Sequence, residues 1–315
     1  MTGSGLVTLG ETMALVAAAQ IGSLASNRDL RLSVAGAESN VAIGVRRLGA
    51  GATWISRLGD DGFGELIRRE LRAEGITVVA ATDAERPTGL MVKERPNALR
   101  THVRYYRSGS AASAMTAFDV VAEAVASAQV LHVTGITPAL GPGPASAIQL
   151  AVDMAHEYGT LVSLDLNYRS TLWSRDEAGA ALEPLVRRAD VVFAGPEEAS
   201  LVVADGTPEK LVHGLADLGP EQVVLKLGAH GAHSLIDGEE YVTPVVPVPV
   251  VDTVGAGDAF VAGYLAELMA GATVPTRLAT AVAAGAFACT TLGDWEGLPT
   301  RADLDALGQT EGVHR

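Results

Sequence analysis

The nine residues Asp252–Phe260 read DTVGAGDAF and lie between a strand-like apolar run, Val245–Val251, and an apolar helical stretch, Ala259–Ala270. A strand, a glycine-rich turn and a helix in this order leave free backbone amides at a helix N-terminus. These amides and the helix dipole both favour a bound anion. The stretch therefore predicts a phosphate-binding turn within an α/β fold.

The amides of Gly255, Ala256 and Gly257 would form this anion site, and Asp258 follows them directly. A carboxylate beside a phosphate is repulsive unless it has another task. Accepting the proton of the hydroxyl group that attacks the phosphoryl group is such a task. The alternative for the motif alone is a glycine-rich turn whose aspartate caps a helix.

Composition excludes several classes of protein. The chain has 315 residues, 48% of them hydrophobic, which suits one large α/β domain with a small addition. The net charge of −14 argues against a nucleic-acid partner, and the single cysteine, Cys289, argues against a disulfide framework. We find no signal-peptide pattern and no apolar run that would span a membrane, so we expect a cytoplasmic protein.

Short apolar runs alternate with stretches of helical periodicity along most of the chain. We expect strands at Leu6–Leu9, Thr53–Ser56, Val130–Val133, Leu161–Leu166, Val191–Ala194 and Val223–Leu227. We expect helices at Glu38–Leu48, Phe63–Ala73, Pro144–Glu157, Glu177–Arg187, Pro208–Leu218, Gly257–Ala270 and Arg277–Thr290. This alternation predicts a mostly parallel sheet that is covered on both faces.

Two segments interrupt the alternation. Thr12–Val34 lacks a convincing helix, and Thr88–Arg107 indicates two strands joined by a turn around Pro96-Asn97. In the second of these strands Val103, Tyr105 and Arg107 share one face, and polar side chains occupy the other face as well. We therefore expect a small exposed sheet that packs over a ligand or another subunit.

Polar residues also cluster at the expected ends of strands and starts of helices. Asp165, Asn167 and Arg169 would share one face at the carboxyl end of a strand, where open α/β sheets bind ligands. Arginine there suits a carboxylate or phosphate, and a surface salt bridge is the alternative. Glu198 would complement a helix dipole or act near magnesium, and Lys226 would be solvated or meet a nucleotide phosphate.

Together these motifs resemble the ribokinase/PfkB family of ATP-dependent sugar kinases over essentially the whole chain. Asp252–Phe260 matches the second family signature, and Gly36–Gly49 with Gly59–Gly64 matches the first. Further stretches are similar to the subfamily that phosphorylates 2-keto-3-deoxygluconate: Gly36–Ala42, Tyr105–Ala111, Thr134–Leu140 and Leu164–Trp173.

The resemblance implies a ribokinase-like, Rossmann-type three-layer α/β sandwich with a mostly parallel central sheet. Residues 1–11, 35–87 and 108–315 would form this nucleotide- and substrate-binding domain. Residues 12–34 and 88–107 would form a small β-sheet lid, through which the protein would form a homo-oligomer.

The resemblance also implies the roles of individual residues. Asp258 would be the general base, with Gly255, Ala256 and Gly257 as the anion hole. The sugar acid would contact Gly36, Asn40, Tyr105, Arg107, Ile136, Arg169 and Asp294. The nucleotide would contact Lys226, Gly228, Gly255 and Gly257, and Glu198 would act on Mg²⁺ through water. The implied cofactors are ATP and Mg²⁺.

The expected reaction is ATP-dependent phosphorylation of the terminal 6-hydroxyl of 2-keto-3-deoxygluconate. Two guanidinium groups, Arg107 and Arg169, converge on the expected cleft and favour an acidic over a neutral sugar, because an unpaired desolvated charge is costly. Fructose or 2-keto-3-deoxygalactonate as substrate, a non-catalytic sugar-acid sensor and a dinucleotide-dependent oxidoreductase are the alternatives. Gly195 and Met91 depart from the subfamily pattern, at an asparagine and a tyrosine position respectively.

Overall fold

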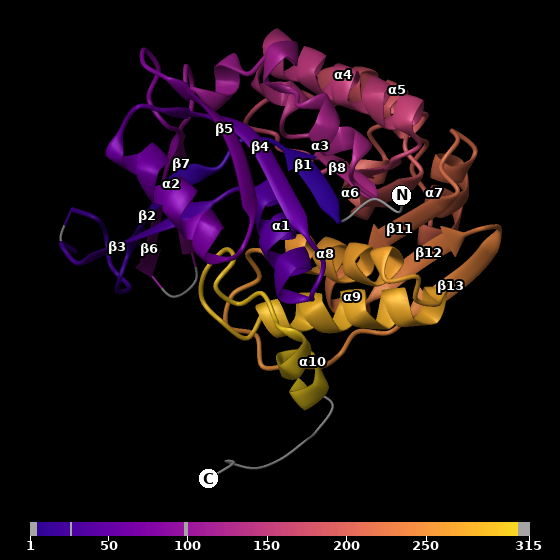
Figure 1. Ribbon diagram of the computed structural model, residues 1–315. Coiled ribbons are helices and arrows are strands. Elements are labelled where there is room, and N and C mark those ends of the chain that lie inside the picture. The colour runs from indigo at the N-terminus through magenta and orange to yellow at the C-terminus, as the bar shows by residue number, and fades with distance from the viewer. Residues whose placement is uncertain (1–4, 26, 98–99, 308–315) are drawn as a thin grey trace.

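The central sheet of the protein follows from strands that are buried on both faces. We describe it from a computed structural model, which covers residues 5–25, 27–97 and 100–307 (Figure 1). Within these residues the large sheet has nine strands in the order β13-β12-β11-β10-β9-β8-β1-β4-β5. The bounds of its strands are β1 Leu6–Leu9, β4 Ala52–Gly59, β5 Thr77–Asp83, β8 Val130–Thr134, β9 Leu161–Asp165, β10 Val191–Ala194, β11 Gln222–Lys226, β12 Ala232–Ile236 and β13 Glu239–Thr243.

Helices cover both faces of this sheet and produce the three layers (Figure 1). Their bounds are α1 Ala37–Arg47, α2 Gly62–Ala73, α3 Ala122–Ala126, α4 Pro142–Tyr158, α5 Arg175–Val186, α6 Pro196–Ala199, α7 Pro208–Ala216, α8 Ala256–Met269, α9 Val274–Ala288 and α10 Arg301–Leu307. One core cluster joins the sheet to α1, α2, α8 and α9, and the other joins it to α3, α4, α5 and α7. The expected three-layer α/β class is confirmed. No helix in the described ranges has the length and apolar character needed to cross a membrane.

Most expected elements are present, with boundaries that shift by a few residues. The strand at Leu6–Leu9 and that at Val191–Ala194 have the expected bounds. The antiparallel strands β12 and β13 and the edge strand β5 lie outside the expected strand ranges. β5 is only half-buried, so its apolar pattern is weak. The expectation of a strand-like run at Val245–Val251 is wrong, because no strand forms there. Pro247 and Pro249 within that run have no amide to donate to a sheet.

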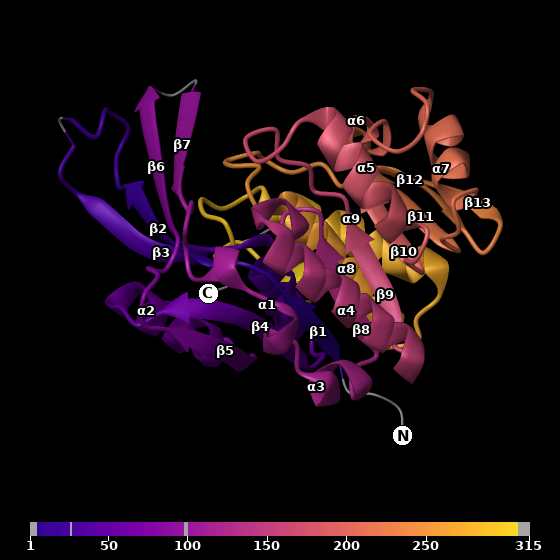
Figure 2. The same ribbon diagram turned by 90° about the horizontal axis from the view of Figure 1, so that it is seen from above.

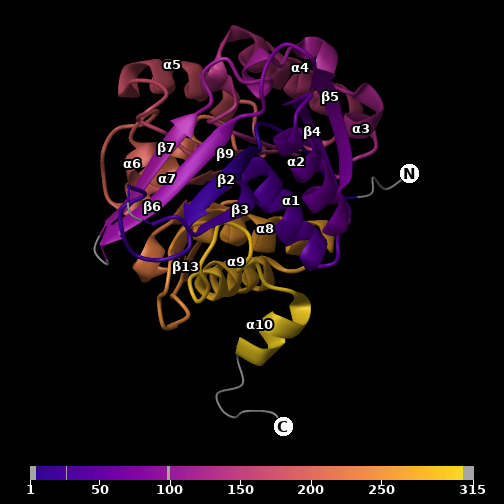
Figure 3. The same ribbon diagram turned by 90° about the vertical axis from the view of Figure 1, so that its left-hand side faces the viewer.

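The two irregular segments form one small sheet, in the order β3-β2-β6-β7. Its strands are β2 Met13–Ala18, β3 Leu30–Ala35, β6 Leu90–Asn97 and β7 Arg100–Tyr106. β2 and β6 are parallel, and the two outer pairs are antiparallel. Figures 2 and 3 show this small sheet standing apart from the large one, beside α1 and α2. The proposed domain boundaries and the role of the small sheet as a lid stay predictions.

The expected turn residues Pro96 and Asn97 belong to β6. The residues between β6 and β7, 98–99, lie outside the described residues. Pro96 is tolerated in the strand because the ladder to β2 ends at Lys93 and the register to β7 is irregular between Glu94 and Asn97.

Candidate active site

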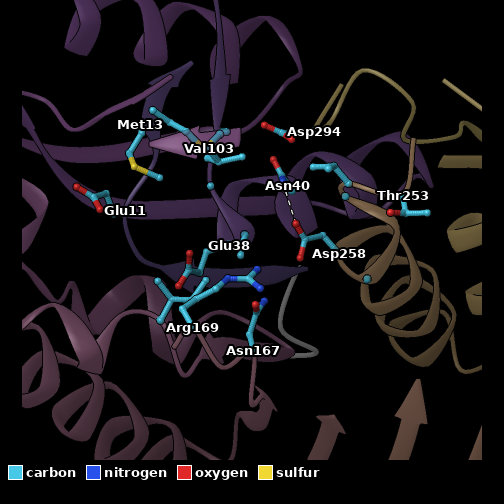
Figure 4. Close-up of a pocket in the computed structure, with 18 of the residues that line it drawn as sticks. Glu11, Met13, Glu38, Asn40, Val103, Asn167, Arg169, Thr253, Asp258 and Asp294 are labelled. Carbon is cyan, nitrogen blue, oxygen red and sulfur yellow. Dashed lines mark hydrogen bonds between the residues drawn. The ribbon is translucent and has the colours of Figure 1, made fainter. Parts of the chain in front are cut away.

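A cavity of about 870 Å³ lies between the carboxyl ends of the central strands and the small sheet. Figure 4 shows the side chains of Asn40, Asn167, Arg169 and Asp258 gathered in this cavity. The residues to which the family resemblance assigns a role line it, with the exception of Ala256: Gly36, Asn40, Tyr105, Arg107, Ile136, Arg169, Glu198, Lys226, Gly228, Gly255, Gly257, Asp258 and Asp294. The fold therefore brings these residues together, and their individual roles stay predictions.

The turn before α8 places the N-terminus of that helix beside the cavity. Gly255 is the N-cap residue of α8 and has a φ of 77°, in the left-handed region that favours glycine. A Cβ atom there would also lie 2.0 Å from the carbonyl oxygen of Asp294. Both the backbone angle and the close approach of Asp294 therefore require glycine at this position. The residues that follow it start helix α8 beside the cavity.

Asp258 lies in the first turn of α8, recessed but still facing the cavity. The side-chain amide of Asn40, in the first turns of α1, donates a hydrogen bond of 2.8 Å to its Oδ2 (Figure 4). Burial raises the pKa of Asp258 to about 7, against the lowering effects of Asn40, Arg169 and Lys226. A carboxyl group with this pKa can accept a proton near neutral pH and release it again.

Gly36 sets the position of α1 and hence of Asn40. A Cβ atom on Gly36 would lie 2.5 Å from the carbonyl oxygen of Glu11, in the chain that leaves β1. The absence of a side chain lets the start of α1 lie directly against this segment, which aims Asn40 at α8.

Lys226 is paired inside the protein. Its Nζ lies 2.8 and 2.6 Å from the two carboxylate oxygens of Asp165, which is buried at the end of β9. Burial disfavours the charged form of Lys226, but the carboxylates of Asp165, Glu198 and Asp258 outweigh this and raise its pKa. The ammonium group thus stays charged where it lines the cavity.

The expectation that Asp165, Asn167 and Arg169 share one ligand-facing surface is wrong for Asp165. Asn167 and Arg169 line the cavity, whereas Asp165 lies beneath it as the partner of Lys226. Strand β9 ends at Asp165, and Asn167 has a φ of 39°. The chain therefore leaves the extended conformation on which the alternation of faces depends.

The two predicted arginines differ in their surroundings. Arg107 is paired with the buried Glu11 at 2.6 Å, and Glu11 also accepts a hydrogen bond of 2.5 Å from Ser110. The side chain of Arg169 is exposed to the cavity and has no hydrogen bond or ion pair with any residue that the structure describes. The argument that an acidic substrate must neutralise a desolvated charge is therefore wrong for Arg107, which Glu11 already neutralises. Arg169 is exposed rather than desolvated, so its contact with a substrate carboxylate stays a prediction.

Glu198 connects two loops at the cavity. Its Oε1 accepts a hydrogen bond of 3.0 Å from the amide of Tyr168, and its Oε2 accepts one of 2.6 Å from the amide of Gly195. The backbone amide of Gly195 makes the contact to Oε2, so this contact does not depend on an asparagine side chain at position 195. Among the described residues no group of three or more acidic, histidine or cysteine side chains is placed to hold a metal ion.

Four charged cavity residues were absent from the predicted site: Glu11, Glu38, Lys93 and Glu197. Glu38 is buried in the first turn of α1, and burial raises its pKa. Its Oε1 accepts hydrogen bonds of 2.7 Å from both Thr134 and Thr137, so it fixes the loop that carries Ile136. Alternation along β6 offered the signal for Lys93, because it shares a face with Met91. No local sequence pattern indicated that Glu11 pairs with Arg107.

Comparison with known proteins agrees with this geometry. Residues 4–301 match the model of the pfkB family of carbohydrate kinases. The chain is 36% identical to 2-dehydro-3-deoxygluconokinase of Bacillus subtilis, with 98% of this chain and 97% of that protein covered. It is also 36% identical to 2-dehydro-3-deoxygalactonokinase of Haloferax volcanii, with 92% of each chain covered.

A solved structure shows the same fold. The chain superposes with a TM-score of 0.90 on a protein assigned as ribokinase II from E. coli, solved in complex with ATP and Mg²⁺. The two chains are 25% identical, and the match covers 98% of this chain and 100% of that one. A match to the family model over nearly the whole chain, two curated relatives at 36% identity and the site geometry lead to one conclusion: the chain belongs to the PfkB family of carbohydrate kinases.

Proposed function

We propose that the protein transfers the γ-phosphoryl group of ATP to the terminal 6-hydroxyl of 2-keto-3-deoxygluconate. The proposal rests on two groups in the same cavity: Asp258, beside the turn at Gly255, and Arg169, whose side chain has no ion-pair partner among the described residues. The first group suits a proton acceptor and the second a carboxylate receptor. The curated name of the Bacillus subtilis relative supports the same substrate, since 2-dehydro and 2-keto denote the same group.

In the proposed reaction the sugar hydroxyl oxygen attacks the γ-phosphorus and the bond to the β-phosphate oxygen breaks, which releases ADP. Asp258 accepts the hydroxyl proton and later returns it to solvent. The amides of Gly255, Ala256 and Gly257 would donate to the oxygens of the transferred group, where negative charge gathers. The hydrogen bond from Asn40 holds the carboxylate in place.

The sugar acid would lie between the small sheet and the central strands. Arg169 would bind its carboxylate, and Gly36, Asn40, Ile136 and Asp294 would contact its oxygens. Tyr105 and Arg107, on and directly after β7, would cover it from the small sheet. Arg107 contributes as an ion pair with Glu11, so its part is to shape the cavity and donate its remaining N–H groups.

ATP would lie at the other end of the cavity, near Lys226, Gly228 and the turn at Gly255. The E. coli structure, solved in complex with ATP and Mg²⁺, supports the choice of these two cofactors. Glu198 keeps acceptor capacity beyond its two amide contacts and faces the cavity, which suits a contact to Mg²⁺ through water. Bound magnesium would neutralise charge on the phosphates. We expect no turnover in excess EDTA and recovery on addition of Mg²⁺.

The activity should depend on the ionisation of Asp258. Because burial raises its pKa to about 7, the carboxyl group is neutral and inactive as a base at lower pH. We expect kcat/KM for the sugar acid to rise about tenfold per pH unit up to pH of about 7 and then to level off. Initial rates between pH 5 and 9 measure this, and a profile that is flat from pH 5 upward would contradict it.

A panel assay tests the proposed substrate directly. ADP release would be measured with 2-keto-3-deoxygluconate, 2-keto-3-deoxygalactonate, gluconate, fructose and ribose at equal concentrations. We expect the highest kcat/KM for 2-keto-3-deoxygluconate. The second candidate is its galactonate epimer, which the name of the Haloferax volcanii relative favours. Preference for fructose or ribose over both would reject the sugar-acid proposal and leave the carbohydrate kinase.

We also propose that two copies associate through the outer face of the small sheet. Leu30, Leu32 and Tyr106 are 51%, 54% and 61% exposed on β3 and β7. Leu32 and Tyr106 also line an apolar groove of about 650 Å³ against the start of α2. Large exposed apolar side chains grouped in this way favour association. Sedimentation should show a dimer that Leu32→Asp converts to a monomer.

A further inference from the structure

Lys93 extends from the small sheet to the segments that surround the anion site. It is one of three lysines in the chain, lies on β6 and is 9% exposed. Its Nζ lies 3.1 Å from Oδ2 of Asp252 and 3.8 Å from Oδ1 of Asp294. Both carboxylates come from the opposite side of the cavity, at the start of the DTVGAGD turn and after α9. One ammonium group therefore joins three segments that are distant in sequence.

The two aspartates are attached firmly to the anion site. The amide of Asp252 donates to the carbonyl oxygen of Cys289 at 3.2 Å, and its Oδ1 accepts a hydrogen bond of 3.3 Å from Val254. The backbone of Asp294 packs directly against Gly255, whose missing Cβ leaves room for its carbonyl oxygen. A displacement of either aspartate would thus move the turn whose amides receive the phosphoryl group.

The carboxylates around Nζ of Lys93 favour a cation at this position. The carboxylates of Asp252 and Asp294 both lie near Nζ of Lys93, and Glu296 adds a third negative charge that acts on Asp294. The pKa of Asp294 is raised to about 6, mainly by burial and also by Glu296 and Asp252, while Lys93 opposes the increase. Without Lys93 the carboxyl group would be protonated over a wider pH range, so it would lose acceptor capacity toward a sugar hydroxyl.

We propose that Lys93 is a positioning residue that ties the small sheet to the phosphoryl-binding turn and orients Asp294 toward the sugar. This proposal rests on the proposed function, because it assumes that a sugar hydroxyl meets Asp294. Strand β6 would then have a second role besides covering the cavity. Through the side chain of Lys93 it would couple the position of the small sheet to that of the turn.

The test compares Lys93→Met, which removes the charge but keeps the length, with Lys93→Arg, which keeps the charge. Arg104→Met is the matched control, because Arg104 lies exposed on the neighbouring strand β7 and does not line the cavity. We expect Lys93→Met to raise KM for the best sugar acid by about tenfold or more, with a much smaller change in KM for ATP. The increase should be larger at pH 6 than at pH 8, and Lys93→Arg should recover most of the loss.

Hydrogen exchange provides a readout that does not depend on the substrate. In the ligand-free protein, Lys93→Met should speed exchange in both residues 90–97 and residues 252–258, and Arg104→Met should leave the second segment unchanged. Unchanged exchange in residues 252–258 overturns the proposal, and so does an unchanged sugar KM. If the wild-type protein phosphorylates no sugar acid, the proposed function fails by itself, and exchange alone then decides whether Lys93 positions the turn.

Discussion

Asp258→Asn is expected to lower kcat by about 10²–10⁴-fold, the usual contribution of a positioned general base. Asparagine has the same size, and its side-chain oxygen can still accept the hydrogen bond that Asn40 donates. What it cannot do is accept the proton of the attacking hydroxyl. KM values for sugar and ATP should therefore change little, because the lost interaction develops only in the transition state.

Steady-state kinetics with both substrates measure this effect. Asp176→Asn is the matched control, because Asp176 also lies in the first helical turn, at the exposed start of α5. The control should retain the wild-type kcat. If Asp258→Asn also retained it, another group would have to accept the proton, and the assignment of Asp258 would be wrong.

Arg169→Ala is expected to raise KM for the sugar acid by about 10–100-fold, as loss of a charge-assisted hydrogen bond predicts. Arg169 faces the cavity without a partner in the described part of the chain, so its removal leaves no protein carboxylate buried and unpaired. A contact made equally with bound substrate and transition state affects KM more than kcat. KM for ATP should stay close to the wild-type value.

Two further measurements separate a carboxylate contact from a general defect. Fructose lacks a carboxylate, so its weaker turnover should respond much less to Arg169→Ala, and an equal loss on fructose would contradict the proposal. Arg169 also lowers the pKa of Asp258. Its removal should therefore shift the acid limb of the pH profile to higher pH. Arg187→Ala, an exposed arginine of the helix end after α5, is the control.

Arg107→Ala is a less informative variant, although the sequence makes the two arginines look equivalent. It would leave the buried carboxylate of Glu11 without its cation, and an unpaired buried charge is strongly destabilising. A loss of activity in that variant would report on folding as well as on binding.

Local pattern was sufficient for much of the fold. Val191–Ala194 is apolar throughout and forms a central strand with the expected bounds. The failures have local causes as well, since Pro247 and Pro249 exclude a strand at Val245–Val251, and β5 is too exposed to show a continuous apolar run. Edge strands and exposed strands give weak sequence signals because only part of each is buried.

The sequence by itself determined the local geometry of the turn at Gly255 and of the start of α8. Gly255, Gly257 and Asp258 lie within four consecutive residues, so their geometry follows from one turn and the helix after it. It also determined that the small sheet is separate, because its strands lack the buried pattern of the large sheet. These conclusions depend on short-range backbone geometry, which a sequence pattern specifies directly.

Only the tertiary structure decided which charges are free to meet a ligand. Glu11 and Arg107 are 96 residues apart, and Asp165 and Lys226 are 61 apart, yet each pair is in direct contact. Lys93 reaches Asp252 across 159 residues. The energy of an ion pair depends on distance and burial after folding, and neither quantity is contained in a local pattern. Arg107 therefore differs from Arg169 because the folded chain places the carboxylate of Glu11 beside it.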